Sequence, residues 1–247
     1  VYQGRHEFDG QLPDWSAQGI AAEVTRLHAA RDRAAAVNGL SGAEAFERDY
    51  LLSQFDHDLF WLEDAQQPFT NPAFYIGALD PAPYLTRNYA PIERRLRSYI
   101  VYARAVPGAA EQIRANLRTP LAKPHAERGI SGFGGYADFY KTDVAKAFTD
   151  VKDAALQKEL ADVNAAASKA MSDLAAWLKE QLKTATGSYA LGSERFAKMV
   201  RVTEGVTTSL PDLEAVAKMD LARNQQALRE ACGLFAKGAT IPACIAK

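Results

Sequence analysis

KDAALQKELADVNAAASKAMSDLAAWLKEQLK, residues 152–183, is the stretch that decides the fold class of this 247-residue chain. Its apolar residues recur in steps of three and four, at Leu156, Leu160, Val163, Ala167, Ala170, Met171, Leu174, Trp177, Leu178 and Leu182. This spacing places one continuous apolar stripe on a helix of 3.6 residues per turn. Neither Gly nor Pro interrupts the stretch, which would measure roughly 45 Å as a helix. We therefore predict a long central helix that ends before Gly187.

Helical patterns also flank this stretch on both sides. Ser16 or Asp14 is placed to cap a helix that reaches about Val37, and Ser41 with Glu44 forms a capping-box pattern at the start of the next. The second of these carries many aromatic residues, and we expect it to be buried on more than one side. Further helices are predicted over residues 92–106, 109–117, 137–151, 194–203 and 211–237. No segment shows the alternation of a strand, so we predict an all-α multi-helix bundle, without a substantial sheet, as a single domain over residues 1–247.

Residues 118–136 form the least regular part of the sequence. They contain two prolines and the glycines at 129, 132, 134 and 135. We predict a surface loop there, because Gly and Pro usually interrupt helices. The run at 129–135 could cradle a phosphate, or it could simply be flexible; it lacks the Lys-Ser/Thr pair of a P-loop.

Composition excludes several classes of function. The chain has 29 basic and 30 acidic residues, a formal net charge of -1, so no basic surface argues for nucleic acid. No run approaches the roughly 18 apolar residues of a membrane span. The sequence opens without Met and without a signal-peptide pattern, from which we expect that an upstream segment was removed.

The two cysteines, Cys232 and Cys244, flank Gly238, which is expected to end a helix. They could face each other across a turn and form a disulfide, as an even count in an extracytoplasmic protein suggests. Two buried free thiols are the alternative.

Catalytic motifs are scarce. The zinc-peptidase signature HExxH is absent, and no two of His6, His28, His57 and His125 stand three or four residues apart. His57 lies between acidic residues and could be an acid/base group or a structural one. The aromatic residues Trp61, Phe69, Phe74, Tyr75 and Tyr84 could line a groove for an extended substrate or form a hydrophobic plug at a helix junction. No residue is therefore assigned as catalytic or as a metal ligand.

Several motifs resemble the bacterial "domain of unknown function 885" family. Residues 2–16, YQGRHEFDGQLPDWS, are similar to the family's opening, in which a Gly and an aromatic-Asp pair precede Leu-x-Asp-x-Ser. Asn71-Pro72-x-x-Tyr75 looks like its Asn-Pro-x-x-Tyr step, and residues 109–120 look like its "A-x-x-N-L … P" segment. The strongest match is AAWL at 175–178 followed by YALGSERF at 189–196.

The resemblance implies a larger protein than this chain. Members of the family are roughly twice as long, mostly helical, and often secreted or lipid-anchored. Their C-terminal halves carry HExxH and a downstream Glu, which imply a zinc-dependent peptidase. By resemblance, this chain would be the N-terminal half, forming one wall of a substrate channel and inactive alone, and zinc would belong to the full-length parent only. His6, Asp9, Asn71 and Tyr75 match family motifs and are candidates for substrate binding, although helix caps and turns explain them equally well.

Two hypotheses follow from these patterns. In the first, the chain is part of a periplasmic or secreted zinc peptidase, its partners being the missing C-terminal half and a peptide substrate. A large exposed apolar face, or self-association through it, is then expected. In the second, the chain is a stand-alone extracytoplasmic helical binding or scaffold module.

Overall fold

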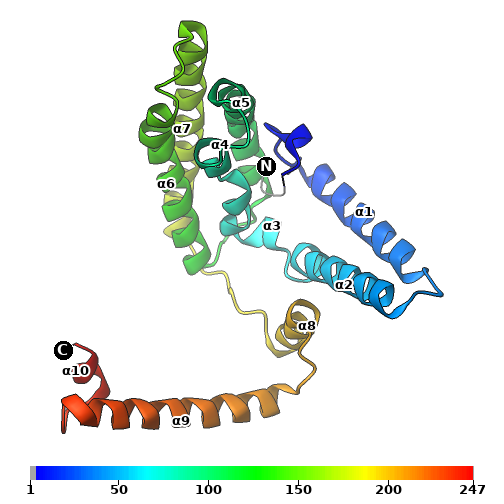
Figure 1. The fold of residues 1–247 in the computed structure, drawn as a ribbon, viewed down its shortest axis with the longest axis vertical. Coiled ribbons are helices and arrows are strands. Elements are labelled where there is room, and N and C mark those ends of the chain that lie inside the picture. Colours follow the sequence, from blue (N-terminus) through cyan, green and yellow to red (C-terminus); the bar gives the residue numbers. More distant parts are fainter. Residues whose placement is uncertain (1–3, 247) are drawn as a thin grey trace. The chain divides into compact units, whose positions relative to one another are not determined.

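The computed structural model describes residues 4–246, and this part of the chain is all-α (Figure 1). An isolated bridge between Ala122 and Gly187 is its only β-type pairing in the described residues. The predicted fold class is therefore confirmed. The sequence was predicted to form a single domain. In the structure, the contacts between residues group into two compact units, residues 1–190 and residues 191–247.

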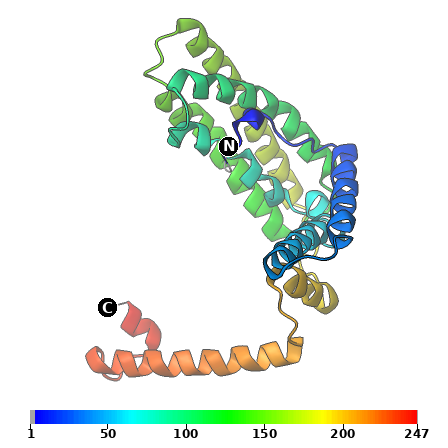
Figure 2. The ribbon, with the colours of Figure 1, turned by 45° about the vertical axis from the view of Figure 1, so that its right-hand side comes forward.

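Three long helices form the centre of the first unit. They are α5 (Ile92–Asn116), α6 (Lys123–Ala147) and α7 (Ala154–Leu182), and they lie side by side in Figures 1 and 2. The helix α7 begins and ends within two residues of the predicted range, and the carboxylate of Asp153 caps its first turn by accepting from the amides of Ala155 and Leu156. Its buried apolar residues follow the predicted stripe: Leu156, Leu160, Val163, Ala167, Met171, Leu174 and Leu178.

Two further helices, α1 (Ala17–Ala35) and α2 (Gly42–Leu59), pack against each other. The predicted caps are present: Ser16 Oγ accepts from the amide of Gly19 at 3.0 Å, and Ser41 with Glu44 forms a capping box. The Arg31 guanidinium on α1 donates to the Asp56 carboxylate on α2 at 2.5 Å, which adds a polar link between the two helices.

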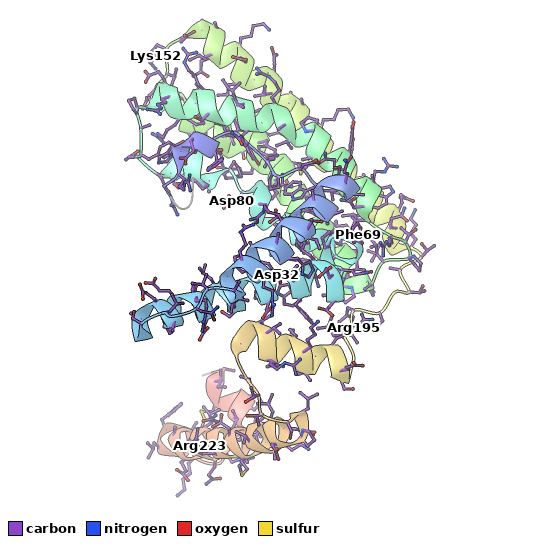
Figure 3. All side chains as sticks on the ribbon, turned by 90° about the vertical axis from the view of Figure 1, so that its right-hand side faces the viewer. Asp32, Phe69, Asp80, Lys152, Arg195 and Arg223 are labelled. Carbon is purple, nitrogen blue, oxygen red and sulfur yellow. A yellow bond between two sulfur atoms is a disulfide. The ribbon has the colours of Figure 1, made fainter. Side chains whose placement is uncertain are left out.

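Short elements connect this pair to the three long helices. The helix α2 continues into η2, a π-helical turn over Phe60–Asp64. After it come α3 (Gln67–Thr70), η3 (Pro72–Tyr75), η4 (Gly77–Leu79) and α4 (Ala82–Thr86), while η1 (His6–Phe8) lies near the start of the chain. The side chains of this region cover its ribbon in Figure 3, where Phe69 and Asp80 mark α3 and the end of η4.

The prediction of a surface loop over residues 118–136 is wrong, because α6 runs through most of this segment. Pro124 is accepted at the start of the helix, where a missing N–H costs nothing. The buried residues of α6 recur in steps of three and four: Ala126, Gly129, Phe133, Ala137, Tyr140 and Val144. Gly129 is thus one position of a continuous buried stripe, and burial of that stripe outweighs the low helix propensity of glycine. With residues 129–135 inside a helix, the phosphate-cradle alternative fails too.

Two other local predictions are wrong. Helices were predicted over residues 92–106 and 109–117 with a break at Pro107-Gly108, but a single helix, α5, runs through both. Ala103, Val106, Ala110 and Ile113 are all buried on it, in steps of three and four across the proline. The aromatic helix α2 was expected to be buried on several sides, yet Phe46 is 72% and Tyr50 57% exposed. Because α2 packs mainly against α1, its outer face keeps these apolar side chains at the surface.

The second unit contains α8 (Ser193–Glu204), α9 (Leu210–Phe235) and α10 (Ile241–Ile245). Cys232 and Cys244 form a disulfide between the last two helices, with their Cα atoms 5.9 Å apart. These cysteines and Ala236 form the small buried cluster of this unit. Apolar side chains elsewhere on α9 are exposed, among them Val216, Met219, Leu221, Leu228, Leu234 and Phe235.

Removal of the disulfide is expected to release α10. The bond joins residues 12 apart, and the entropy of closing a loop of this size corresponds to about 2–3 kcal/mol. In a Cys232→Ser/Cys244→Ser variant we expect the backbone amides at positions 244 and 246 to exchange hydrogen at least about tenfold faster. Exchange in the first half of α9 should be unchanged and is the internal control. Two reactive thiols in the denatured, unreduced wild-type protein would contradict the disulfide.

Within residues 4–246, every helix is too short or too polar to cross a lipid bilayer.

Candidate functional site

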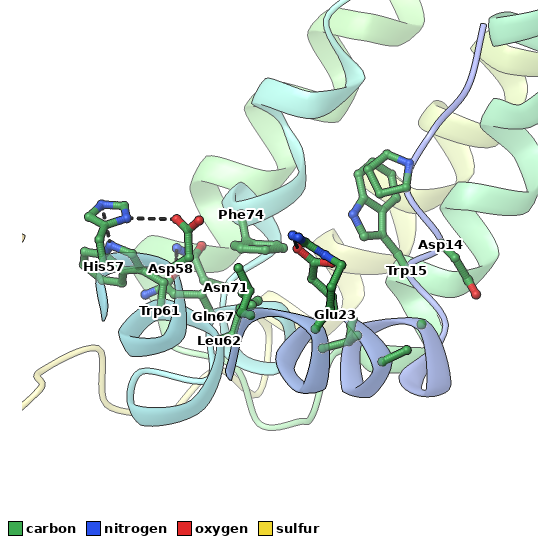
Figure 4. Close-up of a pocket in the computed structure, with 16 residues that line it drawn as sticks. Asp14, Trp15, Glu23, His57, Asp58, Trp61, Leu62, Gln67, Asn71 and Phe74 are labelled. Atoms are coloured by element: carbon green, nitrogen blue, oxygen red, sulfur yellow. Dashed lines mark hydrogen bonds and ion pairs between the residues drawn. The ribbon is translucent and has the colours of Figure 1, made fainter. Parts of the chain in front are cut away.

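A cleft of about 1100 Å³ opens in the first unit between α1 and the segment from the end of α2 to η3 (Figure 4). Its apolar lining consists of Pro13, Trp15, Gly19, Ile20, Ala22, Leu27, Trp61, Leu62 and Phe74. Its polar lining consists of Asp14, Glu23, Arg26, His57, Asp58, Gln67 and Asn71. The cleft therefore combines a mostly apolar surface with a few polar groups, which is the usual composition of a ligand site.

One wall of the cleft is a face of α1. Ile20, Glu23 and Leu27 follow one another at steps of three and four, so their side chains share this face. Ile20 and Leu27 are buried. The Arg26 guanidinium donates to both carboxylate oxygens of Glu23, from Nε at 2.7 Å and from the terminal nitrogen. This hydrogen bonding raises the pKa of Arg26 above its ordinary value.

The opposite wall comes from the π-helical turn. The amide of Ala65 donates to the carbonyl of Phe60 at 2.9 Å, five residues earlier, and this wider turn carries Trp61 and Leu62. Turns of this kind are rare and often occur at functional sites. Gln66 follows in a left-handed conformation with φ of 49°, which is uncommon for a residue other than glycine. The backbone is thus unusual at the point where it forms the wall.

Polar contacts order the outer end of this wall. The indole N–H of Trp61 donates to His57 Nε2 at 3.1 Å. His57 Nδ1 lies 3.1 Å from a carboxylate oxygen of Asp58. Since an indole can only donate, Nε2 must be the acceptor, and the ring proton of the neutral imidazole is on Nδ1, facing Asp58. The chain Trp61–His57–Asp58 therefore fixes the tautomer of His57.

Trp15, at the inner end of the cleft, is held by a buried network. The Asn116 side-chain amide donates to the carbonyl of Trp15 at 2.6 Å and to the hydroxyl of Tyr75 at 3.1 Å. The Tyr75 hydroxyl in turn donates to the carbonyl of Pro68 at 2.7 Å. Burial raises the pKa of Tyr75 to about 12, so this hydroxyl keeps its proton at neutral pH. The network joins α5, α3 and η3 behind the cleft.

The four candidate substrate-binding residues do not meet in one place. Asn71 lines the cleft, and it also caps η3 by accepting from the amide of Ala73 at 3.0 Å. Tyr75 is fully buried behind the cleft. His6 Nδ1 contacts the Asp9 carboxylate at 3.2 Å and its ring stacks on Tyr89, and neither His6 nor Asp9 lines the cleft.

The five aromatic residues singled out from the sequence divide between the two predicted roles, a groove and a hydrophobic plug. Trp61 and Phe74 line the cleft, as a groove requires. Tyr75 and Tyr84 are buried, as in a plug, and Phe69 lies under the Arg118 guanidinium, 4.5 Å from its ring centroid. The wall formed by α1 could not be recognised from the sequence. Its three- and four-residue spacing is visible there, but an apolar helix face shows the same pattern whether it borders a core or a cleft.

Potential metal ligands lie apart from one another in the part of the chain that the structure describes. Across residues 4–246, the His, Cys, Asp and Glu side chains form no group of three or more that could hold a metal ion.

The fold and the cleft define an all-α protein with a mostly apolar cleft in the same unit as its three long helices. The chain belongs to the family described as "Bacterial protein of unknown function (DUF885)", whose model matches residues 1–247. No curated protein matches the chain.

A solved structure with a similar fold is described as "a putative lipoprotein of unknown function" from Shewanella oneidensis. The two share 19% sequence identity with a TM-score of 0.80, and the match covers 94% of this chain and 43% of that one. The chain thus spans less than half the length of this relative. At this identity the likeness concerns the fold alone.

Proposed function

We propose that this chain is the substrate-binding helical part of a zinc-dependent peptidase, whose metal ligands lie outside the chain. In this role it contributes a wall of the substrate channel and has no hydrolytic activity by itself. Its substrate is a peptide, its other partner is the catalytic part of the parent protein, and zinc belongs to that part. The peptidase assignment comes from the resemblance of the motifs, and the absence of a metal-ligand group among the described residues is compatible with it.

The observation that carries the proposal is the cleft itself. Its volume of about 1100 Å³ is large enough for several peptide residues. Trp61 and Phe74 offer aromatic surface to apolar side chains, and Gln67 and Asn71 offer amide groups that can pair with a peptide backbone. A peptide needs both kinds of contact.

A periplasmic or secreted location fits this role. The disulfide between Cys232 and Cys244 would persist in an oxidising compartment, and the similar solved structure is described as "a putative lipoprotein of unknown function". The same disulfide supports the alternative, a stand-alone extracytoplasmic binding module. Both roles use the cleft, and they differ in whether the parent protein cleaves the bound peptide.

Peptide binding to the 247-residue chain tests the proposal. The probe is a blocked neutral pentapeptide, acetyl-Ala-Ala-Phe-Ala-Ala-amide, and the readout is ¹⁹F NMR of protein labelled with 5-fluorotryptophan. The chain has three tryptophans, of which Trp15 and Trp61 line the cleft and Trp177 does not. We expect the resonances of Trp15 and Trp61 to shift on titration, with that of Trp177 unchanged and the peptide left intact.

Removal of the aromatic wall should weaken this binding. Truncation of a central aromatic anchor costs more than 1 kcal/mol, so Trp61→Ala should raise the Kd about tenfold. Phe46→Ala, which truncates an exposed aromatic residue of α2 outside the cleft, should leave the Kd unchanged. Absence of any shift at millimolar peptide would overturn the proposed binding role, and cleavage by the chain alone would overturn the assignment of catalysis to another part of the protein.

A further inference from the structure

The charges around the cleft are unequal in number and in how they are paired. Three carboxylates, those of Asp14, Glu23 and Asp58, line it, against the single guanidinium of Arg26. His57 is the fifth titratable group, and its Nε2 accepts from the Trp61 N–H. The described lining residues therefore carry a formal charge of about -2, since three negative charges face one positive charge.

The positive charge of Arg26 is already paired with a carboxylate on its own helix. Its guanidinium makes a two-point contact with the Glu23 carboxylate, with Nε donating at 2.7 Å. The two charges cancel at short range, and both lie on the same face of α1. Among the described lining residues, a peptide's terminal carboxylate would meet one cationic side chain, already paired with Glu23, and three carboxylates.

Asp14 and Asp58 lie at opposite ends of the cleft (Figure 4). Asp14 accepts from the amide of Ser16 at 2.9 Å and from the side-chain amide of Gln112 at 3.1 Å. In Figure 4 it lies beyond Trp15, far from the end formed by His57 and Asp58. Its carboxylate is thus occupied by donors from the protein's own chain.

Asp58 is the carboxylate best placed to receive a ligand. Its side chain is 54% exposed, and its contact within the cleft wall is the neutral Nδ1–H of His57 at 3.1 Å. The negative charge of Asp58 also acts on Arg26, whose guanidinium is already hydrogen-bonded to Glu23. Figure 4 shows Asp58 beside Trp61, with Phe74 and Leu62 toward the middle of the cleft. A negative charge therefore borders an aromatic and aliphatic surface.

We propose that the cleft selects peptide segments in which an apolar side chain neighbours an ammonium or guanidinium group, with Asp58 receiving the positive charge. This inference rests on the proposed function and names its substrate class. The apolar side chain packs between the α1 face and the Trp61 wall, and the cation lies at the outer end. A basic side chain and a free N-terminal amine supply the same charge, and the experiment separates them.

The test compares blocked pentapeptides that differ only in charge. We expect acetyl-Ala-Lys-Phe-Ala-Ala-amide to bind about three- to fivefold more tightly than the neutral probe at low ionic strength, because partly exposed ion pairs contribute modestly. The corresponding Glu peptide should bind more weakly than the neutral one, and added salt should reduce both differences. The unblocked peptide Phe-Ala-Ala-amide tests whether a terminal amine can replace the lysine.

Asp58→Asn is the decisive variant. Its amide oxygen can still accept from His57, so the wall should be retained while the charge is lost. We expect the preference for lysine to vanish, so that the Kd values of the neutral and lysine peptides become equal within this variant. Asp32→Asn is the matched control, since it changes the net charge equally from an exposed position of α1 outside the cleft.

The outcomes separate the two proposals. Binding of the neutral peptide without a preference for lysine would overturn the charge selection alone. A preference that survives in Asp58→Asn, or one that is lost equally in Asp32→Asn, would overturn the role of Asp58. If no peptide binds, the proposed function itself fails.

Discussion

Asn116→Ala is expected to destabilise the first unit by about 3 kcal/mol, the combined cost of unpaired buried polar groups and a cavity. The lost amide leaves the Trp15 carbonyl, which accepts from it at 2.6 Å, without this donor. The Tyr75 hydroxyl loses the same donor but keeps its own bond to Pro68. Urea unfolding followed by tryptophan fluorescence measures the change, since all three tryptophans lie in this unit.

Asn116→Asp separates hydrogen bonding from volume. A carboxylate has nearly the same shape, but it cannot donate to the Trp15 carbonyl, and it adds a buried charge. We therefore expect it to destabilise at least as much as alanine does. Asn88→Ala, at an exposed position, should change the free energy of unfolding by less than about 0.5 kcal/mol. An Asn116→Asp variant as stable as the wild type would show that the hydrogen bonds donated by Asn116 do not stabilise the first unit.

Gly129→Val is expected to destabilise the first unit by about 3 kcal/mol or more through overpacking. A Cβ atom at position 129 would lie 2.8 Å from Leu178 Cδ1 on α7 and 2.8 Å from Pro72 Cβ on η3. The Leu178 side chain can turn aside, whereas the proline ring is rigid. Valine adds two further methyl groups in the same space, so α6 would have to move away from η3.

Gly134→Ala in the same helix is the matched comparison. A Cβ there would meet nothing within 4 Å. Alanine favours a helix over glycine by up to about 1 kcal/mol, so this variant should be more stable than the wild type. Thermal unfolding by circular dichroism distinguishes the two substitutions by their opposite signs. Equal effects at both positions would mean that helix propensity, and not close packing, governs the glycines of α6.

The long helices could be predicted because their stripes need no information beyond the sequence. The stripe of α7 contains no Gly or Pro, and its predicted ends differ from the observed ones by only two residues at the start and one at the end. The helix caps at Ser16 and Ser41 could also be predicted from the sequence, because each cap is a hydrogen bond between a side chain and a backbone amide only three residues away. Local patterns of this kind persist whatever the remainder of the chain does.

The errors arose where distant contacts outweigh local preference. Gly129 and Gly132 suggest a loop when read alone, but each faces a neighbour too close for a side chain, Pro72 for the first and Ile76 for the second. Pro107 suggests a turn, yet burial continues on both sides of it along one helix face. In both cases tertiary packing, which the sequence does not display, decides the structure.

The cleft was only partly accessible to prediction. Trp61, Phe74, Asn71 and His57 were singled out from the sequence, and all four line it. Glu23 and Arg26 were not, because a charged pair on a helix usually belongs to a solvated face. Their place in the cleft depends on α1 lying opposite η2, a pairing between segments some 35 residues apart, as in the contact of His28 with Glu63.

The π-helical turn of η2 makes the cleft wall depend on chain length as well as on side-chain identity. Such a turn holds one residue more than an α-helical turn, and one residue corresponds to about 100° of rotation around a helix. The residues before and after Phe60–Asp64 are therefore out of phase with a single continuous α-helix. A change of one residue in length would rotate everything beyond it relative to α2, so this wall could be redirected as a whole by a single insertion or deletion.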